Sequence, residues 1–218
     1  MIQRHVLIVD DHQILRQGLK SLLEKEPDLK VVAEAEDGRT AIEIVQAQPI
    51  DLVIMDVAMP ALNGMEATRK ILAVNPGLKV IGLSMHTDRR FVTEMLRAGA
   101  AGFVSKECAF EELVQAIRTL DAGKRYLSPS LNIATGDSPE SAGGFVDEPS
   151  AFSSLTNRER EVLQLMAEGQ NTKQIAMNLH VSIKTIETHR RQIMEKLDLY
   201  SVAELTKYAI REGLTTLS

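Results

Sequence analysis

The feature that most constrains the fold is an alternation of five short apolar runs with longer stretches of helical period. The runs are His5 to Val9, Lys30 to Glu34, Asp51 to Met55, Lys79 to Leu83 and Gly102 to Ser105. Between them, apolar residues recur at helical spacing, as they do from Leu15 to Leu23. Short apolar strands that alternate with amphipathic helices indicate a parallel sheet with helices on both faces. The sequence therefore predicts a doubly wound α/β domain of five strands and five helices.

Polar side chains follow the predicted strands at their carboxyl ends. Asp10 and Asp11 come after the first strand, Asp56 after the third, Ser84 after the fourth and Lys106 after the fifth. In an open parallel sheet, ligands bind beyond the carboxyl ends of the strands, near the point where the strand order reverses. We therefore expect these side chains to converge on one site.

Three carboxylates that share one site repel one another unless a cation lies between them. Oxygen ligands favour a hard divalent cation, and Mg²⁺ suits a site that also retains water molecules. Lys106 adds a second positive charge, and Ser84 adds a hydroxyl donor. Such a site suits phosphoryl transfer, in which positioning and charge neutralisation carry most of the catalysis. Asp56 is the best candidate for the nucleophile.

Four separated motifs in roughly the first 125 residues resemble the receiver domains of bacterial two-component response regulators. They are Asp10-Asp11 after the first strand, Asp56-Val57-Ala58-Met59-Pro60 ending in Asn63-Gly64, the Ser84 hydroxyl, and Ala101-Gly102-Phe103 before Lys106. The resemblance implies a flavodoxin-like receiver over residues 1–127, with the strand order 2-1-3-4-5.

The resemblance also implies the chemistry of the pocket. A sensor histidine kinase would supply a phosphoryl group to Asp56, with Mg²⁺ as the cofactor. Asp11, Asp56 and the carbonyl oxygen of Ala58 would ligate the Mg²⁺, and Asp10 would assist through a water molecule. The chain would then be a stoichiometric phosphoacceptor with slow autodephosphorylation, and not an enzyme.

Ser84, Lys106 and Phe103 would form a switch by the same resemblance. A phosphoryl group on Asp56 would attract Ser84 and Lys106, which leaves space for the ring of Phe103 to turn inward. Phe103 stands where a tyrosine is often found, so an inward ring would report the switch by packing alone.

Two other functions are open at this point. A phosphatase of the haloacid-dehalogenase type needs a second acid two residues after its aspartyl nucleophile, and this chain has Ala58 there. The second alternative is a DNA-binding module that does not depend on phosphorylation and retains a vestigial acidic site. Sustained turnover of phosphate esters would indicate the phosphatase, and full DNA affinity in Asp56→Asn would indicate the module.

A change in composition separates the first domain from the last. Residues 129–152 contain no Lys or Arg and four acidic residues, whereas residues 153–218 contain nine Lys or Arg and eight acidic residues. Glycine, proline and serine are frequent from Ser128 to Ser154, without sustained apolar periodicity. The composition predicts a flexible acidic linker over residues 128–153, which tethers two domains without fixing their geometry.

Residues 154–218 contain start signals for several short helices. Thr156 and Glu159 form a capping-box pattern before an apolar stretch. A second helix is predicted from Thr172 to Leu179, followed by a tight turn and a third helix. The sequence therefore predicts a small all-α domain of four helices, with a helix-turn-helix at about residues 172–191.

The third predicted helix begins after Ser182 and has two different faces. Ile186, Ile193 and Leu197 form its inner stripe. The outer face carries, at helical spacing, Lys184, Glu187, Thr188, Arg191 and Glu195. This face is the candidate for DNA readout, with an ordinary solvated helix surface as the alternative.

The last domain resembles the LuxR-type output domain, which makes the whole chain similar to the NarL/FixJ class of response regulators. The matching segments are Leu155-Thr156-Asn157-Arg158-Glu159, Lys173-Gln174-Ile175-Ala176, Lys184-Thr185-Ile186-Glu187-Thr188-His189 and Lys196-Leu197. The resemblance implies a double-stranded DNA operator, with Glu187, Thr188 and Arg191 at base edges in the major groove. The residues that would mainly hold the phosphate backbone are Lys173, Lys184, Thr185 and Arg190.

A homodimer is expected, because one small domain of near-neutral charge should bind DNA weakly. Val202, Leu205 and Ala209 on the last predicted helix are candidates for the dimer contact. The resemblance allows phosphorylation either to release the output domain or to pair two receivers, and it allows RNA polymerase as a further partner.

No uncharged apolar run reaches the roughly 18 residues that a membrane span needs. The amino terminus lacks a secretory pattern. We therefore expect a cytoplasmic protein without membrane contact. The single cysteine, Cys108, cannot form an internal disulfide and has no Cys or His neighbour at metal-ligand spacing, which indicates a small, partly buried apolar residue.

Overall fold

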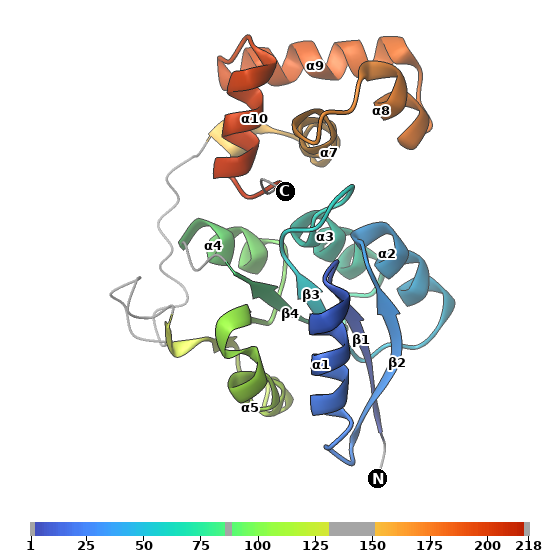
Figure 1. Ribbon diagram of the computed structural model, residues 1–218, viewed down its shortest axis with the longest axis vertical. Helices are drawn as coiled ribbons and strands as arrows, with labels where there is room; N and C mark the ends of the chain where they lie inside the picture. Colours follow the sequence, from blue (N-terminus) through green and yellow to red (C-terminus); the bar gives the residue numbers. More distant parts are fainter. Residues whose placement is uncertain (1–2, 86–88, 131–150, 216–218) are drawn as a thin grey trace. The chain divides into compact units, whose positions relative to one another are not determined.

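The computed structural model describes residues 3–85, 89–130 and 151–215 (Figure 1). The chain divides into two compact units, Met1–Phe145 and Val146–Ser218. Most of the predicted linker, residues 131–150, lies outside the described residues. Among the helices that are described, none is both long and apolar enough to cross a membrane.

The first unit contains a parallel sheet of six strands in the order β2-β1-β3-β4-β5-β6. The strands are β1 (Arg4–Val9), β2 (Leu29–Ala35), β3 (Leu52–Asp56), β4 (Lys79–Ser84), β5 (Gly102–Ser105) and β6 (Tyr126–Leu127). Side chains of β1 alternate between two core clusters, with Leu7 and Val9 in one and Val6 and Ile8 in the other. The predicted doubly wound fold and the order of its five strands are confirmed.

The sixth strand corrects the prediction of five strands. β6 pairs in parallel with β5, with Gly102 opposite Tyr126 and Phe103 opposite Leu127. A strand of two residues has no apolar alternation that a sequence pattern could reveal. Ser128, predicted as the first residue of the flexible linker, is buried, and its N–H donates to the carbonyl oxygen of Phe103 at 2.9 Å.

Helices cover both faces of the sheet (Figure 1). Those of the first unit are α1 (Gln13–Leu23), α2 (Gly38–Ala47), α3 (Gly64–Val74), α4 (Arg89–Arg97) and α5 (Ala109–Asp121). On one face, α1 and α5 bury Leu19 and Leu113. On the other face, α2, α3 and α4 bury Ala41, Ile71 and Met95. Because both faces are covered, the central strands are apolar at consecutive positions.

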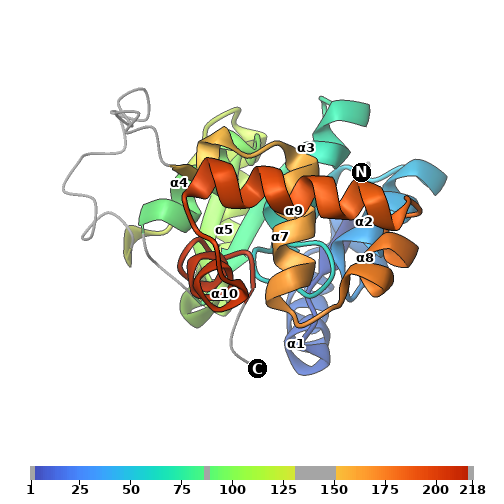
Figure 2. The ribbon, with the colours of Figure 1, turned by 90° about the horizontal axis from the view of Figure 1, so that it is seen from above.

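The described part of the second unit contains a short 3-10 helix (Ala151–Ser154) and four α-helices: α7 (Asn157–Ala167), α8 (Thr172–Asn178), α9 (Ile183–Leu197) and α10 (Val202–Arg211). Capping boxes begin α7, α8 and α10, and the Ser182 side chain caps α9. Each cap satisfies N–H groups of the first turn, so the helix starts are fixed by local sequence. Figure 2 shows the long helix α9 running across α7, with α8 and α10 near its two ends.

The apolar residues of α10 correct another prediction. Leu205 and Ala209, predicted as dimer contacts, are buried in the core cluster of the second unit. They are buried because α10 packs against α7, so its apolar stripe faces the core of its own unit. Val202, the third predicted contact, is 47% exposed.

Candidate functional site

An acidic pocket forms where the neighbouring strands β1 and β3 end side by side. Asp10 follows β1 and Asp56 ends β3, so both carboxylates lie at the same edge of the sheet. Lys106 lies in a 3-10 turn directly after β5. Its Nζ is 2.7 Å from Oδ2 of Asp10 and 2.7 Å from Oδ2 of Asp56, and all three side chains are buried. The structure therefore brings these three predicted site residues together.

Burial and neighbouring charges determine the protonation of the pocket. Burial raises the pKa of Asp56 to about 7, although Lys106 opposes this rise; Asp10 adds to it. Burial disfavours the charged form of Lys106, but the two carboxylates outweigh it and raise the pKa of the lysine. At neutral pH, Lys106 is therefore a fixed positive charge and Asp56 is close to its titration midpoint.

Four side chains offer ligand atoms for a cation within 4.8 Å of one another: Asp10, Asp11, His12 and Asp56. Oδ2 of Asp10 and Oδ2 of Asp56 accept no hydrogen bond from the described residues beyond their ion pairs with Lys106. Three carboxyl groups share this site with one lysine, and a divalent cation would offset the negative charge that Lys106 does not balance. This donor set is rich in oxygen and fits Mg²⁺.

His12 is a pocket residue that the sequence reasoning missed. Its Nδ1 lies 2.8 Å from Oδ1 of Asp11 and 3.3 Å from Oδ1 of Asp10. The backbone N–H of His12 also donates to Oδ1 of Asp10 at 2.8 Å. As the N-cap residue of α1, His12 stays close to the end of β1. The signal that could have found it is a histidine directly after the acidic pair.

Asn63 and Gly64 hold the segment that follows Asp56. A Cβ atom at Gly64 would lie 1.9 Å from the carbonyl oxygen of Asp56, so only glycine fits this close approach. Oδ1 of Asn63 caps α3 by accepting from the N–H of Glu66 at 3.0 Å. The N–H of Ala58 donates to Oδ1 of Asp56 at 3.2 Å. The segment therefore orients the Asp56 carboxylate through its backbone.

Ser84 and Phe103 lie on adjacent strands next to the pocket. Ser84 is buried at the end of β4, beside the end of β3. Phe103 pairs with Gly82, where a Cβ would lie 3.2 Å from Cδ2 of the ring and 2.8 Å from Cγ of Met95. The missing side chain at Gly82 provides space for the ring. Phe103 is already fully buried, so any response to phosphorylation starts from an enclosed ring.

The predicted DNA contacts lie on α8 and α9 and differ in exposure. Lys173, Lys184, Glu187 and Arg191 are exposed, and Thr185, Thr188 and Arg190 are partly exposed. Nη1 of Arg190 donates to Oγ1 of Thr172 at 2.8 Å, which links α9 to the first turn of α8. A hollow beside α9 brings Glu187 and Arg191 together with Tyr200. Tyr200 is 67% exposed, and the helical pattern missed it because it follows the helix.

A buried carboxylate fixes α9 to α7. Oε2 of Glu159 accepts from the N–H of Thr156 at 2.7 Å, from its hydroxyl at 2.9 Å and from Nζ of Lys196 at 2.7 Å. Burial opposes the negative charge of Glu159, but Lys196 and Thr156 outweigh this effect and lower its pKa. The capping box of α7 therefore also anchors the C-terminal end of the helix that carries most of the predicted DNA contacts.

Two family models match the chain. Residues 6–118 match the response regulator receiver domain, and residues 153–209 match the luxR family of bacterial regulatory proteins. The response regulator UvrY of Escherichia coli (strain K12) is 37% identical over 213 residues, which cover 96% of this chain and 95% of UvrY. The response regulator GacA of Pseudomonas aeruginosa is 37% identical over 212 residues, which cover 96% of each chain.

Solved structures of RcsB resemble the whole chain. The RcsB response regulator of Salmonella typhimurium aligns with a TM-score of 0.58 and 29% identity, over 95% of this chain and 98% of that chain. A complex of the response regulator RcsB with DNA aligns with a TM-score of 0.59 and 28% identity, over 94% of this chain and 97% of that chain.

Proposed function

The chain belongs to the response regulators that join a receiver domain to a LuxR-family output domain, and we propose that phosphorylation of Asp56 controls its binding to DNA. It is a transcription factor of a two-component signal transduction system. The observation that carries the proposal is the buried contact of Lys106 with both Asp10 and Asp56, at 2.7 Å each, beside Asp11. This pocket combines a nucleophile, a fixed positive charge and oxygen ligands for a metal ion.

In the proposed reaction, a carboxylate oxygen of Asp56 attacks the phosphorus atom of a phosphohistidine on the sensor kinase. The phosphorus–nitrogen bond breaks, and an acyl phosphate forms on Asp56. Lys106 keeps its proton because of the neighbouring carboxylates, so its charge stabilises the negative phosphoryl oxygens. The side chain of Lys106 is buried and already in contact with Asp56. The reaction therefore requires little reorganisation of this charge.

Mg²⁺ is the proposed cofactor. Asp11, Asp56 and the carbonyl oxygen of Ala58 would hold it, and Asp10 would assist through a water molecule. When bound, Mg²⁺ neutralises negative charge on the transferring phosphoryl group. Nδ1 of His12 lies 2.8 Å from Oδ1 of Asp11, so a further potential metal ligand stands beside one of the proposed ligands.

The proposed switch begins with the attraction of Ser84 and Lys106 to the phosphoryl group. Ser84 ends β4, and Lys106 follows β5. Attraction of these two side chains to the phosphoryl group would therefore move the carboxyl ends of both strands. Phe103 packs between these strands and α4, beside Gly82 and Met95. Because its ring has no hydroxyl, the side chain of Phe103 transmits a change through packing alone.

The proposed DNA-binding element is α9 in the major groove. Glu187, Thr188 and Arg191 would contact base edges. The backbone contacts would come from Lys173, Lys184, Thr185 and Arg190. Two copies on paired half-sites would supply the affinity that one small domain lacks, with Val202, an exposed apolar residue of α10, at a dimer contact. RNA polymerase is a further proposed partner.

Asp56→Asn tests the function, because an amide keeps the size of the side chain but cannot form an acyl phosphate. Acetyl phosphate with Mg²⁺ should label the wild type and change its affinity for a DNA duplex selected from genomic fragments. The variant should be neither labelled nor responsive. Asp51→Asn, just before the other end of the same strand, is the matched control and should behave like the wild type. An equal gain of affinity in Asp56→Asn would instead favour the phosphorylation-independent module.

We propose stoichiometric modification with slow autodephosphorylation, and not catalytic turnover. A haloacid-dehalogenase phosphatase would need a second acid where this chain has Ala58. Incubation with simple phosphate esters and Mg²⁺ should therefore release little phosphate after the first equivalent. Many turnovers per chain would contradict the proposal.

A further inference from the structure

Strand β6 connects the phosphorylation site to the start of the predicted linker. In the described sheet it pairs only with β5, and its Leu127 lies opposite Phe103. The N–H of Tyr126 donates to the carbonyl oxygen of Ala101 at 3.3 Å, and the N–H of Ser128 donates to that of Phe103 at 2.9 Å. The backbone carbonyl of Phe103, the proposed switch residue, is thus hydrogen-bonded to Ser128, which directly follows β6.

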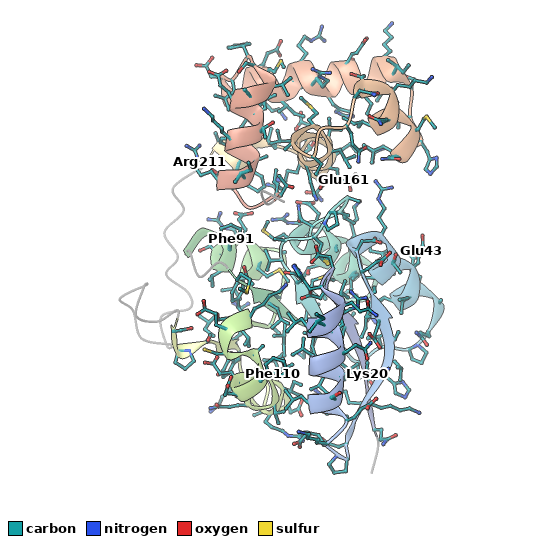
Figure 3. The ribbon with its side chains drawn as sticks, in the orientation of Figure 1. Lys20, Glu43, Phe91, Phe110, Glu161 and Arg211 are labelled. Carbon is teal, nitrogen blue, oxygen red and sulfur yellow. The ribbon has the colours of Figure 1, made fainter. Side chains whose placement is uncertain are left out.

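One carboxylate on α5 holds this strand. Oε2 of Glu112 accepts hydrogen bonds from the hydroxyl of Ser128 and, at 3.3 Å, from the hydroxyl of Tyr126. Burial, together with Glu112, raises the pKa of Tyr126 to about 12, so the phenol keeps its proton and donates at neutral pH. Glu112 lies near the start of α5, close in sequence to Phe110, which Figure 3 labels.

The side chains of β6 enter both cores of the receiver. Tyr126 is buried in the cluster that contains Leu113 and Ile117 of α5. Leu127 packs against the opposite cluster, which contains Phe103. A two-residue strand at a sheet edge makes few backbone hydrogen bonds, and isolated strand pairs are only marginally stable. The contacts with Glu112 are therefore well placed to decide whether β6 stays docked.

We propose that Glu112 is a positioning residue for signal transmission, which keeps β6 docked so that a displacement of β5 moves the first residues of the linker. This inference rests on the proposed phosphorylation of Asp56. Lys106 contacts Asp56 and follows β5 directly, so a movement of Lys106 toward a phosphoryl group displaces a strand of only four residues. Ser128 then passes the displacement along the covalent chain.

Glu112→Ala in the full-length chain tests this role. Glu111→Ala is the matched control, because Glu111 is exposed at the preceding position of the same helix. Hydrogen exchange of the Tyr126 and Ser128 amides reports whether β6 is docked. The ratio of affinities for a DNA duplex selected from genomic fragments, with and without acetyl phosphate and Mg²⁺, reports the coupling.

In Glu112→Ala, we expect exchange of the two amides to rise at least about tenfold, since local opening sets their protection. The affinity ratio should fall about fivefold or more toward one, while labelling of Asp56 stays within about twofold of wild type. Glu112→Gln keeps an acceptor oxygen and should restore both protection and coupling. Ser128→Ala removes one donor without changing α5 and should produce the same two effects to a smaller extent.

Faster exchange in Glu112→Ala together with a wild-type affinity ratio would overturn the proposal, because β6 would then be undocked without consequence. Unchanged exchange would overturn it as well, because Glu112 would not hold the strand. If the wild-type chain is labelled on Asp56 but its DNA affinity is the same with and without acetyl phosphate, phosphorylation is not coupled to DNA binding and the proposal fails. Absence of labelling would instead sink the proposed phosphorylation, and the exchange measurement would still report on Glu112.

Discussion

Replacement of Asp56 by asparagine should change how the stability of the receiver depends on pH. Burial raises the pKa of Asp56 from its ordinary value of 3.8 to about 7. A carboxyl group whose pKa is higher in the folded state than in the unfolded state stabilises the folded state. This stabilisation is complete at pH values below the unfolded-state pKa, and it is lost as the pH rises through the folded-state pKa. The wild type should therefore lose stability between about pH 4 and about pH 7, and asparagine cannot titrate.

The size of this loss follows from the gap between the two pKa values. At about 1.4 kcal/mol per pH unit, the gap corresponds to about 4 kcal/mol. Relative to Asp56→Asn, the unfolding free energy of the wild type should fall by about this amount between about pH 4 and about pH 8. Mg²⁺ should reduce the fall, because a cation at the Asp56 oxygens favours the carboxylate form.

Urea unfolding followed by circular dichroism in metal-free buffer measures the difference at each pH. Titrating groups far from Asp56 are common to both proteins, so their effects cancel when one curve is subtracted from the other. Two parallel curves, with a constant difference across this pH range, would refute the argument that burial holds the pKa of Asp56 near neutrality.

Three further changes test other parts of the structure. Gly64→Ala should lower the unfolding free energy by more than about 3 kcal/mol, because its Cβ would overlap the carbonyl oxygen of Asp56; an unchanged thermal melt would contradict this. Lys106→Met should slow labelling by acetyl phosphate about 100-fold and move the pH–rate profile to higher pH, because Asp56 loses its buried counter-charge. An unshifted profile would argue against the ion pair. Glu159→Gln should lower the unfolding free energy by about 1 kcal/mol at neutral pH, because the ion pair with Lys196 is lost. At pH values below the lowered pKa of Glu159, the substitution should not change the unfolding free energy. Thermal melts that show the same loss at every pH would contradict this.

The receiver pocket could be predicted from the sequence because each of its parts is encoded locally. A buried parallel strand is a continuous apolar run, and parallel strands end at the same edge of the sheet. Asp10, Asp56 and Lys106 directly follow or end such runs, so their convergence does not depend on the conformation of the intervening loops.

Features that depend on a packing partner could not be predicted in this way. Leu205 and Ala209 have helical spacing, but spacing identifies an apolar stripe without identifying whether the domain core or a second copy covers it. The enclosed ring of Phe103 depends on the missing side chain at Gly82, on another strand. His12 enters the pocket through one side chain at a helix start, which no periodic pattern describes.

Strand β6 also determines where the sheet ends. Without it, β5 would present unpaired N–H and C=O groups along one side, and such an open edge is a template for pairing with another chain. The residues that follow α5 thus protect the receiver against edge-to-edge aggregation. A receiver fragment that stops at Arg125 should expose this edge and self-associate, whereas a fragment that continues through Ser130 should keep it closed.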